Sequence, residues 1–132
     1  MNEKMLNSLL QELQWQLPDN LRLVQEGKGI ALTCDGTQAC LRYGSPVDLA
    51  RGLVLVKQMG TDRVYAHSEY NRFETLGVMI DCSRNAVLSV ENAKRLLRVL
   101  ALMGYNMVQL YTETVTGFSM LSLIAFTISA AN

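Results

Sequence analysis

The spacing of apolar and polar positions predicts a mixed α/β fold that begins with a helix. Over residues 3–16, leucine and methionine recur at helical spacing along one face, and Pro18 follows as a stop signal. Short runs rich in β-forming residues come next, at 21–25, 30–34 and 38–43. Because the Asp35-Gly36 pair between the last two is a strong hairpin signal, these runs predict a small antiparallel sheet.

A well-formed helix start follows the third run. Ser45 can accept a hydrogen bond from the free amides of the first turn, and Pro46 lacks the amide that would otherwise stay unpaired. Asp48 places a negative charge at the positive end of the helix. We expect this helix to end at Gly60 and to cover the small sheet, and we expect residues 61–72 to form a polar connection.

The stretch 73–113 predicts one βαβ unit, in which two strands flank a helix. The first strand, around residues 78–80, is continuously apolar, as a strand covered on both faces should be. Ser89 caps the following helix, Gly104 supplies a left-handed end, and residues 107–111 form the second strand. The helix carries one apolar stripe, made of Val90, Ala93, Leu96, Leu97, Leu100 and Met103. A crossover of this kind places the two strands side by side and parallel.

The charge balance and the cysteines narrow the possible functions. The 132 residues carry 12 basic and 12 acidic side chains without a basic run, which argues against a nucleic-acid partner. Cys34, Cys40 and Cys82 fit no metal-binding spacing. We interpret them as buried thiols of a cytoplasmic protein, with a Cys34–Cys40 disulfide across the hairpin as the alternative. The N-terminal segment, acidic at Glu3, does not resemble a secretory signal.

Two segments carry a family resemblance: GKGIALTCDGTQACLRYGSPVDLARGLVLVKQM at 27–59 and LGVMIDCSR at 76–84. With the helix and the NMVQLYTE segment that follow, they resemble the N-terminal part of family 20 glycoside hydrolases, the β-N-acetylhexosaminidases. The first segment is similar to the small α/β domain that precedes the catalytic barrel, and the second is similar to the start of the (β/α)8 barrel. The resemblance implies an α/β domain at 1–70, the barrel start at 71–113 and an atypical apolar tail at 114–132.

The resemblance implies a retaining glycosidase that removes terminal β-linked N-acetylhexosamine from glycans without a metal or organic cofactor. In the family, the Glu of an Asp–Glu pair protonates the leaving oxygen, and the Asp supports attack by the substrate's own acetamido group. That pair belongs to a later strand, and no adjacent Asp–Glu occurs in this sequence. We therefore expect the chain alone to be inactive, with no catalytic residue of its own.

The candidate substrate-binding residues are Asp81, Arg84 and Glu113, at the expected ends of the two strands. Chemistry in a parallel barrel is done at the carboxyl ends of its strands, which favours a position at the barrel mouth. A structural ion pair or turn cap is an equal alternative for Asp81 and Arg84. The Arg-Gly pair with which many family members grip the terminal sugar is replaced here by Leu76-Gly77, so that contact is not carried over.

The tail at 114–132 carries no charge and lacks the polar loop expected after the second strand. One hypothesis is that the reading frame is lost just after Glu113, so that the chain is a fragment of a longer enzyme. The alternative is a non-catalytic structural or interaction module whose tail covers the open sheet, with self-association through exposed strand edges. The apolar run is too short and too broken by serine to span a bilayer, so no membrane partner is expected.

Overall fold

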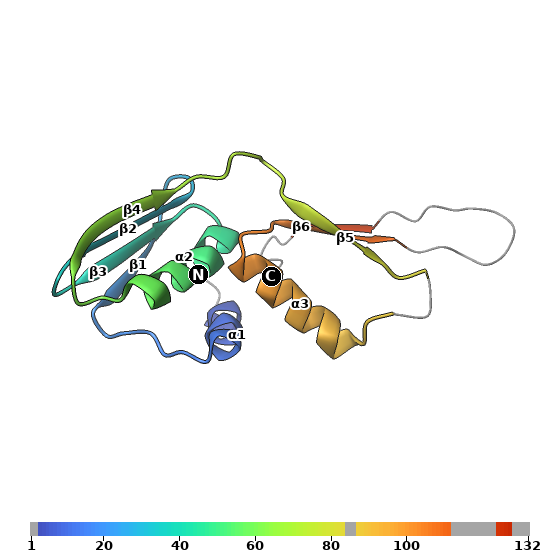
Figure 1. The fold of residues 1–132 in the computed structure, drawn as a ribbon, viewed down its shortest axis with the longest axis horizontal. Helices are drawn as coiled ribbons and strands as arrows, with labels where there is room; N and C mark the ends of the chain where they lie inside the picture. The colour runs from blue at the N-terminus through green and yellow to red at the C-terminus, as the bar shows by residue number, and fades with distance from the viewer. Residues whose placement is uncertain (1–2, 84–86, 112–123, 128–132) are drawn as a thin grey trace, which may run out of the picture.

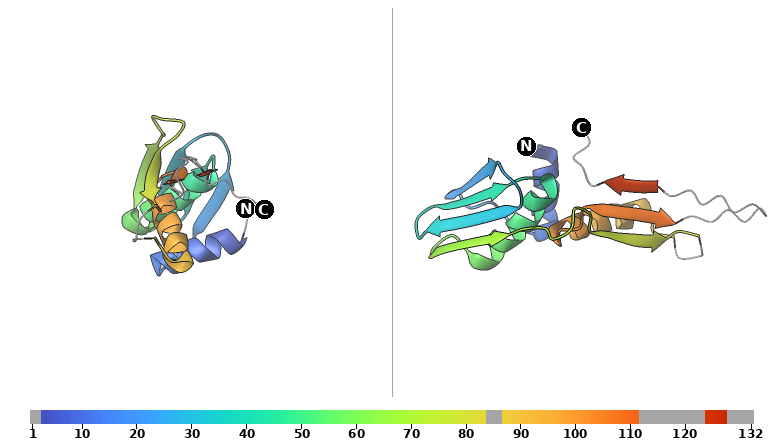
Figure 2. Two further views of the ribbon diagram at one scale, coloured as in Figure 1. Left: turned by 90° about the vertical axis from the view of Figure 1, so that its right-hand side faces the viewer. Right: turned by 90° about the horizontal axis from the view of Figure 1, so that it is seen from above.

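The computed structural model describes residues 3–83, 87–111 and 124–127, and it confirms the predicted mixture of helices and small sheets (Figure 1). The helices are α1 (Glu3–Leu13), α2 (Pro46–Met59) and α3 (Val90–Leu102). The strands are β1 (Leu21–Gln25), β2 (Ile30–Asp35), β3 (Ala39–Tyr43), β4 (Val64–Glu69), β5 (Gly77–Asp81), β6 (Met107–Tyr111) and β7 (Ile124–Thr127). The two sheets lie at opposite ends of an elongated molecule and are joined by the linker between β4 and β5 (Figure 1 and Figure 2).

The first sheet is mixed, and the prediction of an antiparallel sheet is wrong for its first strand. The strand order is β1-β3-β2-β4, with β1 parallel to β3 and β2 antiparallel to β3 and β4. The connection from β1 to β2 passes over the end of β3, where the Glu26 amide donates to the Tyr43 carbonyl at 3.0 Å and the Gly44 amide donates to the Gly29 carbonyl at 3.1 Å. The chain therefore crosses β3 before β2 begins, and β1 and β2 are not neighbours.

β4 lies within the segment 61–72, which the sequence analysis wrongly assigned to a polar connection. It pairs antiparallel with β2 at the edge of the sheet, from Ile30 opposite Glu69 to Asp35 opposite Val64. Its residues alternate between exposed and half-buried positions. Because an edge strand with one open face can carry polar side chains there, the apolar alternation that predicts a strand is weak.

α2 covers one face of the first sheet and contributes more residues to its core than any other described element. The helix begins as predicted, since the Ser45 hydroxyl accepts from the Asp48 amide at 3.1 Å and donates to the Asp48 carboxylate at 2.8 Å. It ends at Gly60, whose φ is 77°. The fully buried residues of this layer are Leu32, Leu41, Leu49, Leu53 and Val56. Burial of each such side chain stabilises the fold by about 2 kcal/mol.

α1 packs against the same core through Leu6 and Leu9, which are 8% and 4% exposed. It ends at Leu13 rather than at residue 16, because Gln14 adopts a left-handed φ of 48°. This reversal, and not Pro18, terminates the helix.

β5, α3 and β6 form the predicted βαβ unit. β5 and β6 are parallel, beginning with Gly77 opposite Met107. Gly104 ends α3 as predicted, with a φ of 91°, and the Tyr105 amide donates back to the Leu100 carbonyl at 2.9 Å. On its other edge β6 pairs antiparallel with β7, so the strand order of the second sheet is β5-β6-β7.

α3 packs against the first half of the molecule through its last turn. Leu100, Ala101 and Leu102 are at most 9% exposed, and the last two belong to the core of the first sheet and its helices. The predicted apolar stripe is only partly correct, because Val90 and Met103 at its ends are 70% and 58% exposed. α3, which begins at Val90, diverges from the strands toward its first turn (Figure 1).

The three cysteines are free, and the alternative of a Cys34–Cys40 disulfide is wrong. Cys34 pairs with Ala39 and Cys40 pairs with Thr33 across the hairpin. Since neighbouring residues of a strand point to opposite faces, the two sulfur atoms lie on opposite sides of the sheet. Within the described ranges, no helix has both the length and the apolar character to cross a membrane.

Candidate functional site

The carboxyl ends of β5 and β6 form the edge at which the sequence predicted the candidate residues. Asp81 is opposite Tyr111, and the Cys82 amide donates to the Tyr111 carbonyl at 2.7 Å. The two strands therefore end level with each other, and side chains that follow them share one edge. Of the three candidates, only Asp81 is placed there, since Arg84 and Glu113 lie outside the described residues.

Asp81 is exposed and organises the turn that follows β5. Its Oδ1 accepts a hydrogen bond from the Ser83 amide at 2.8 Å and another from the Ser83 hydroxyl. A carboxylate that binds the backbone two residues further on forms an Asx turn. Asp81 therefore caps this turn, which was one of the two alternatives for it. Its role in substrate binding stays a prediction.

The described part of this edge can orient a ligand but does not hold two carboxyl groups. Asp81 is the sole acidic residue in β5, in β6 and at positions 82–83. Glycosidases that use two enzyme carboxyl groups place them about 5–10 Å apart. A single exposed carboxylate can accept a hydrogen bond from a sugar hydroxyl, and a second carboxyl group would have to come from outside these residues.

A half-buried ion pair between α2 and β4 was not predicted from the sequence. Nε and Nη2 of Arg51 each donate to one carboxylate oxygen of Glu69, both at 3.1 Å. Nε2 of His67 lies 3.3 Å from Oε1 of Glu69. The bidentate pair with Arg51, aided by His67, holds the pKa of Glu69 below its ordinary value. The two-residue spacing of His67 and Glu69 puts them on one face of a strand, but that signal has meaning only once β4 is recognised.

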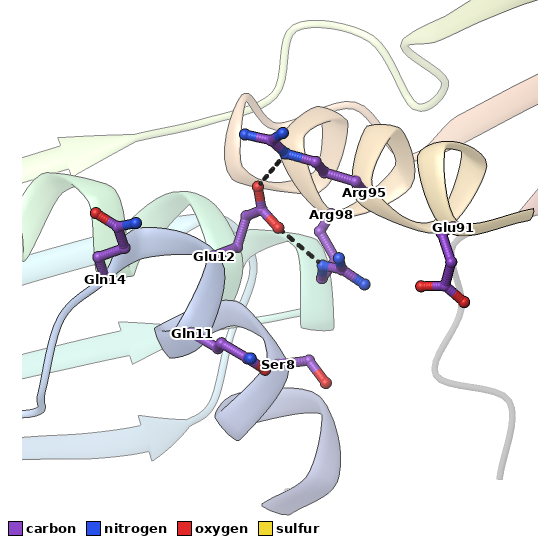
Figure 3. A pocket seen from close by; sticks show the side chains of 7 residues that line it. All are labelled: Ser8, Gln11, Glu12, Gln14, Glu91, Arg95 and Arg98. Atoms are coloured by element: carbon purple, nitrogen blue, oxygen red, sulfur yellow. Dashed lines mark hydrogen bonds and ion pairs between the residues drawn. The ribbon is translucent and has the colours of Figure 1, made fainter. Parts of the chain in front are cut away.

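A polar pocket between α1 and α3 has Glu12 at its centre (Figure 3). Nε of Arg95 and Nε of Arg98 each lie 3.1 Å from a different carboxylate oxygen of Glu12. The Glu12 side chain is 14% exposed, and the hydrogen bonds from Arg98 and then Arg95 lower the pKa of its carboxyl. This cluster ties the first helix to the βαβ unit, so we interpret it as structural.

Within the residues that the structure describes, no group of three or more His, Cys, Asp or Glu side chains could hold a metal ion. Asp48, which is 6% exposed, is a buried carboxylate that the Ser45 hydroxyl already engages. Its burial is therefore explained by the start of α2 and does not indicate a ligand.

Comparison with known proteins finds a shared fold and no matching family. No protein-family model matches the chain, and no curated protein matches it significantly. Among solved structures, the GH20 β-N-acetylhexosaminidase from Streptomyces coelicolor A3(2) matches with a TM-score of 0.66 at 20% sequence identity. The match covers 84% of this chain and 28% of that protein. The chain therefore has the fold of a part of that enzyme and spans little more than a quarter of its length.

Proposed function

We propose that this chain is the N-terminal part of a family 20 glycoside hydrolase. The observation that carries the proposal is the extent of the fold match, which covers 84% of the chain. Neither the α/β half nor the βαβ half of the chain is long enough to supply such coverage alone. The order of the two halves also agrees with the order in the family that the sequence resembles.

In this proposal, residues 1–70 are the domain that precedes the barrel and residues 71–113 are the start of the barrel. β5 and β6 would be its first two strands, and Asp81 would lie at its mouth, where a carboxylate can bind a substrate hydroxyl. The parent enzyme would remove terminal β-linked N-acetylhexosamine by a retaining, substrate-assisted reaction. Its catalytic Asp and Glu would come from a later strand, so the present chain would not hydrolyse glycans.

The coding DNA and an activity assay test the proposal together. Translation beyond codon 113 in all three frames is expected to reveal further barrel strands and an Asp–Glu pair. A polypeptide that joins residues 1–113 to that continuation is expected to hydrolyse a chromogenic N-acetylglucosaminide, and the 132-residue chain is not. The proposal fails if no frame encodes a barrel, and the prediction of inactivity fails if this chain alone shows turnover.

One observation favours a second candidate, a non-catalytic structural or interaction module. β7 pairs antiparallel with β6, on the edge where a (β/α)8 barrel has its third parallel strand. This pairing covers one edge of the second sheet. Among the described strands, β5 is then the strand at the other, open edge.

Thermal unfolding of the full chain and of residues 1–113 separates the two candidates. A loss of stability on removal of residues 114–132, together with a sharp monomer or dimer of the full chain, favours the module. Unchanged or higher stability of the shorter chain, together with soluble aggregates of the full one, favours the enzyme fragment.

A further inference from the structure

A pocket of about 430 Å³ lies beside the linker between β4 and β5, and we call it the linker pocket. It is formed by the connection from β1 to β2, by the start of α2 and by residues 70–74 of the linker. Asp81, which is the candidate residue that the structure describes, does not line it. The linker pocket therefore needs an explanation of its own.

Glycine occupies positions of closest approach among the segments that line the linker pocket. A Cβ atom at Gly44 would lie 2.7 Å from the Gly27 carbonyl oxygen. A Cβ atom at Gly29 would lie 2.6 Å from the Glu69 carbonyl oxygen and 3.0 Å from Cδ1 of Tyr70. A side chain at either position would push these segments apart, so the glycines allow the segments that line the pocket to pack closely.

Two aromatic side chains, Tyr70 and Phe73, stand in the wall of the linker pocket. They are 74% and 67% exposed, although both carry large apolar areas. The face of an aromatic ring is apolar and partly negative, which suits the face of a pyranose ring that presents C–H groups. A single exposed aromatic residue needs no explanation, but two in the lining of one pocket offer ring faces to a ligand.

The charges of the linker pocket balance and do not favour an anionic ligand. Lys28 and Arg72 supply two cations, and Asp48 and Glu74 supply two anions. Asp48 also lies in the first turn of α2, where its charge occupies the place that a phosphate would take. Within the described part of the chain, the side chains of Lys28, Asn71 and Arg72 make no hydrogen bond or ion pair, so their donors are available to hydroxyl groups.

The linker pocket is separate from the candidate site at the carboxyl ends of the strands. The linker leads into Gly77, the first residue of β5, whereas Asp81 is the last. The two ends of this strand are roughly 13 Å apart. A ligand in the linker pocket would therefore lie on the opposite side of the proposed barrel from its mouth.

We propose that the linker pocket binds a neutral glycan. One pyranose ring stacks on Tyr70 or Phe73, and its hydroxyl groups accept hydrogen bonds from Lys28, Asn71 and Arg72. The choice of an N-acetylglucosamine oligomer as the probe rests on the proposed function, but binding at this site requires no catalysis.

The test is a titration of the full 132-residue chain with the trimer of N-acetylglucosamine, followed by backbone amide chemical shifts. Saturable changes are expected at residues 27–29 and 70–74. At least one of Tyr70→Ala and Phe73→Ala, the one that removes the stacking ring, is expected to weaken binding about tenfold, which corresponds to about 1.4 kcal/mol. Tyr70→Phe keeps the ring and should retain most of the affinity. Val64→Ala, at a residue that is 78% exposed on the first sheet, is the control and should have no effect.

Three results would overturn the proposal: no saturable shift, binding that both alanine variants leave unchanged, or tighter binding of a sulfated oligosaccharide than of the neutral trimer. Circular dichroism spectra identify any variant that loses its fold, and Lys28→Ala then replaces it in the comparison. This test is independent of the one for the proposed function. If the chain binds the trimer and no frame encodes a barrel, the proposed glycan site stands and the proposed function fails. If a frame encodes the barrel and the trimer does not bind, the proposed function stands and the glycan site fails.

Discussion

The close contact between α2 and the first sheet makes Gly52 a sensitive test of how this half is packed. Gly52 is buried in α2, and a Cβ atom there would lie 2.7 Å and 2.8 Å from the two Cδ atoms of Leu41. Leu41 is 0% exposed, so its side chain cannot move away into solvent. Overpacking of this kind costs about 1–3 kcal/mol, while replacing glycine by alanine inside a helix gains about 1 kcal/mol. We expect Gly52→Ala to lower the free energy of unfolding by about 1 kcal/mol.

A double-mutant cycle with Leu41→Val, measured by urea unfolding, tests the cause of this loss. Valine at position 41 shortens the side chain that the new methyl group meets, so the double variant should lose less than the sum of the single losses, by about 1 kcal/mol. The pair Gln58→Ala and Gln58→Gly, at an exposed position of α2, measures the helix-propensity term separately. If Gly52→Ala stabilises the chain, or if the two changes are additive within about 0.5 kcal/mol, the reasoning from close packing is refuted.

Three further predictions concern the contacts that hold the second half in place. Gly104→Ala should lower the free energy of unfolding by about 1 kcal/mol in the same urea assay, because alanine is strained at a φ of 91°. Since Arg98 and Arg95 lower the pKa of Glu12 in the folded state, the contribution of Glu12 is present above its ordinary pKa of 4.5 and is lost as the pH falls below that value. Glu12→Gln should therefore lower the melting temperature at pH 7 and the difference should shrink in acid, with Glu3→Gln as the control. Asn106→Asp should keep the hydrogen bond from the Leu76 amide and lose the one to the Glu74 carbonyl, so amide exchange should increase in the linker but less than in Asn106→Ala.

Local signals in the sequence predicted the elements whose ends are fixed by neighbouring residues. The start of α2 at Ser45 and the end of α3 at Gly104 each depend on hydrogen bonds within one helical turn. The residues next to each helix end were therefore enough to predict where these two helices begin or end. The βαβ unit was also predictable, because an apolar strand and a capped helix leave few alternatives for the crossover.

Pairings between distant segments were less predictable. Nothing local in β1 indicates that its neighbour is β3 rather than β2, since this choice depends on how the 26–29 connection crosses the sheet. The ion pair of Arg51 with Glu69 and the cluster around Glu12 join residues from different elements. Long charged side chains occur mostly on surfaces, so their types alone do not identify such partners.

The position of Asp81 depends on how the last turn of α3 and the residue Asn106 beyond it are held. At the last turn of α3, three consecutive buried residues cannot all face one neighbour, because successive side chains of a helix point about 100° apart. Of the three, Ala101 and Leu102 belong to the core of the first sheet and its helices. Just beyond this turn, Asn106 accepts from the Leu76 amide at 2.8 Å and donates to the Glu74 carbonyl at 2.7 Å, which fixes the start of β5 beside the start of β6. With their amino ends held in this way, the strands direct Asp81 away from the linker pocket, and the two sites can be altered independently.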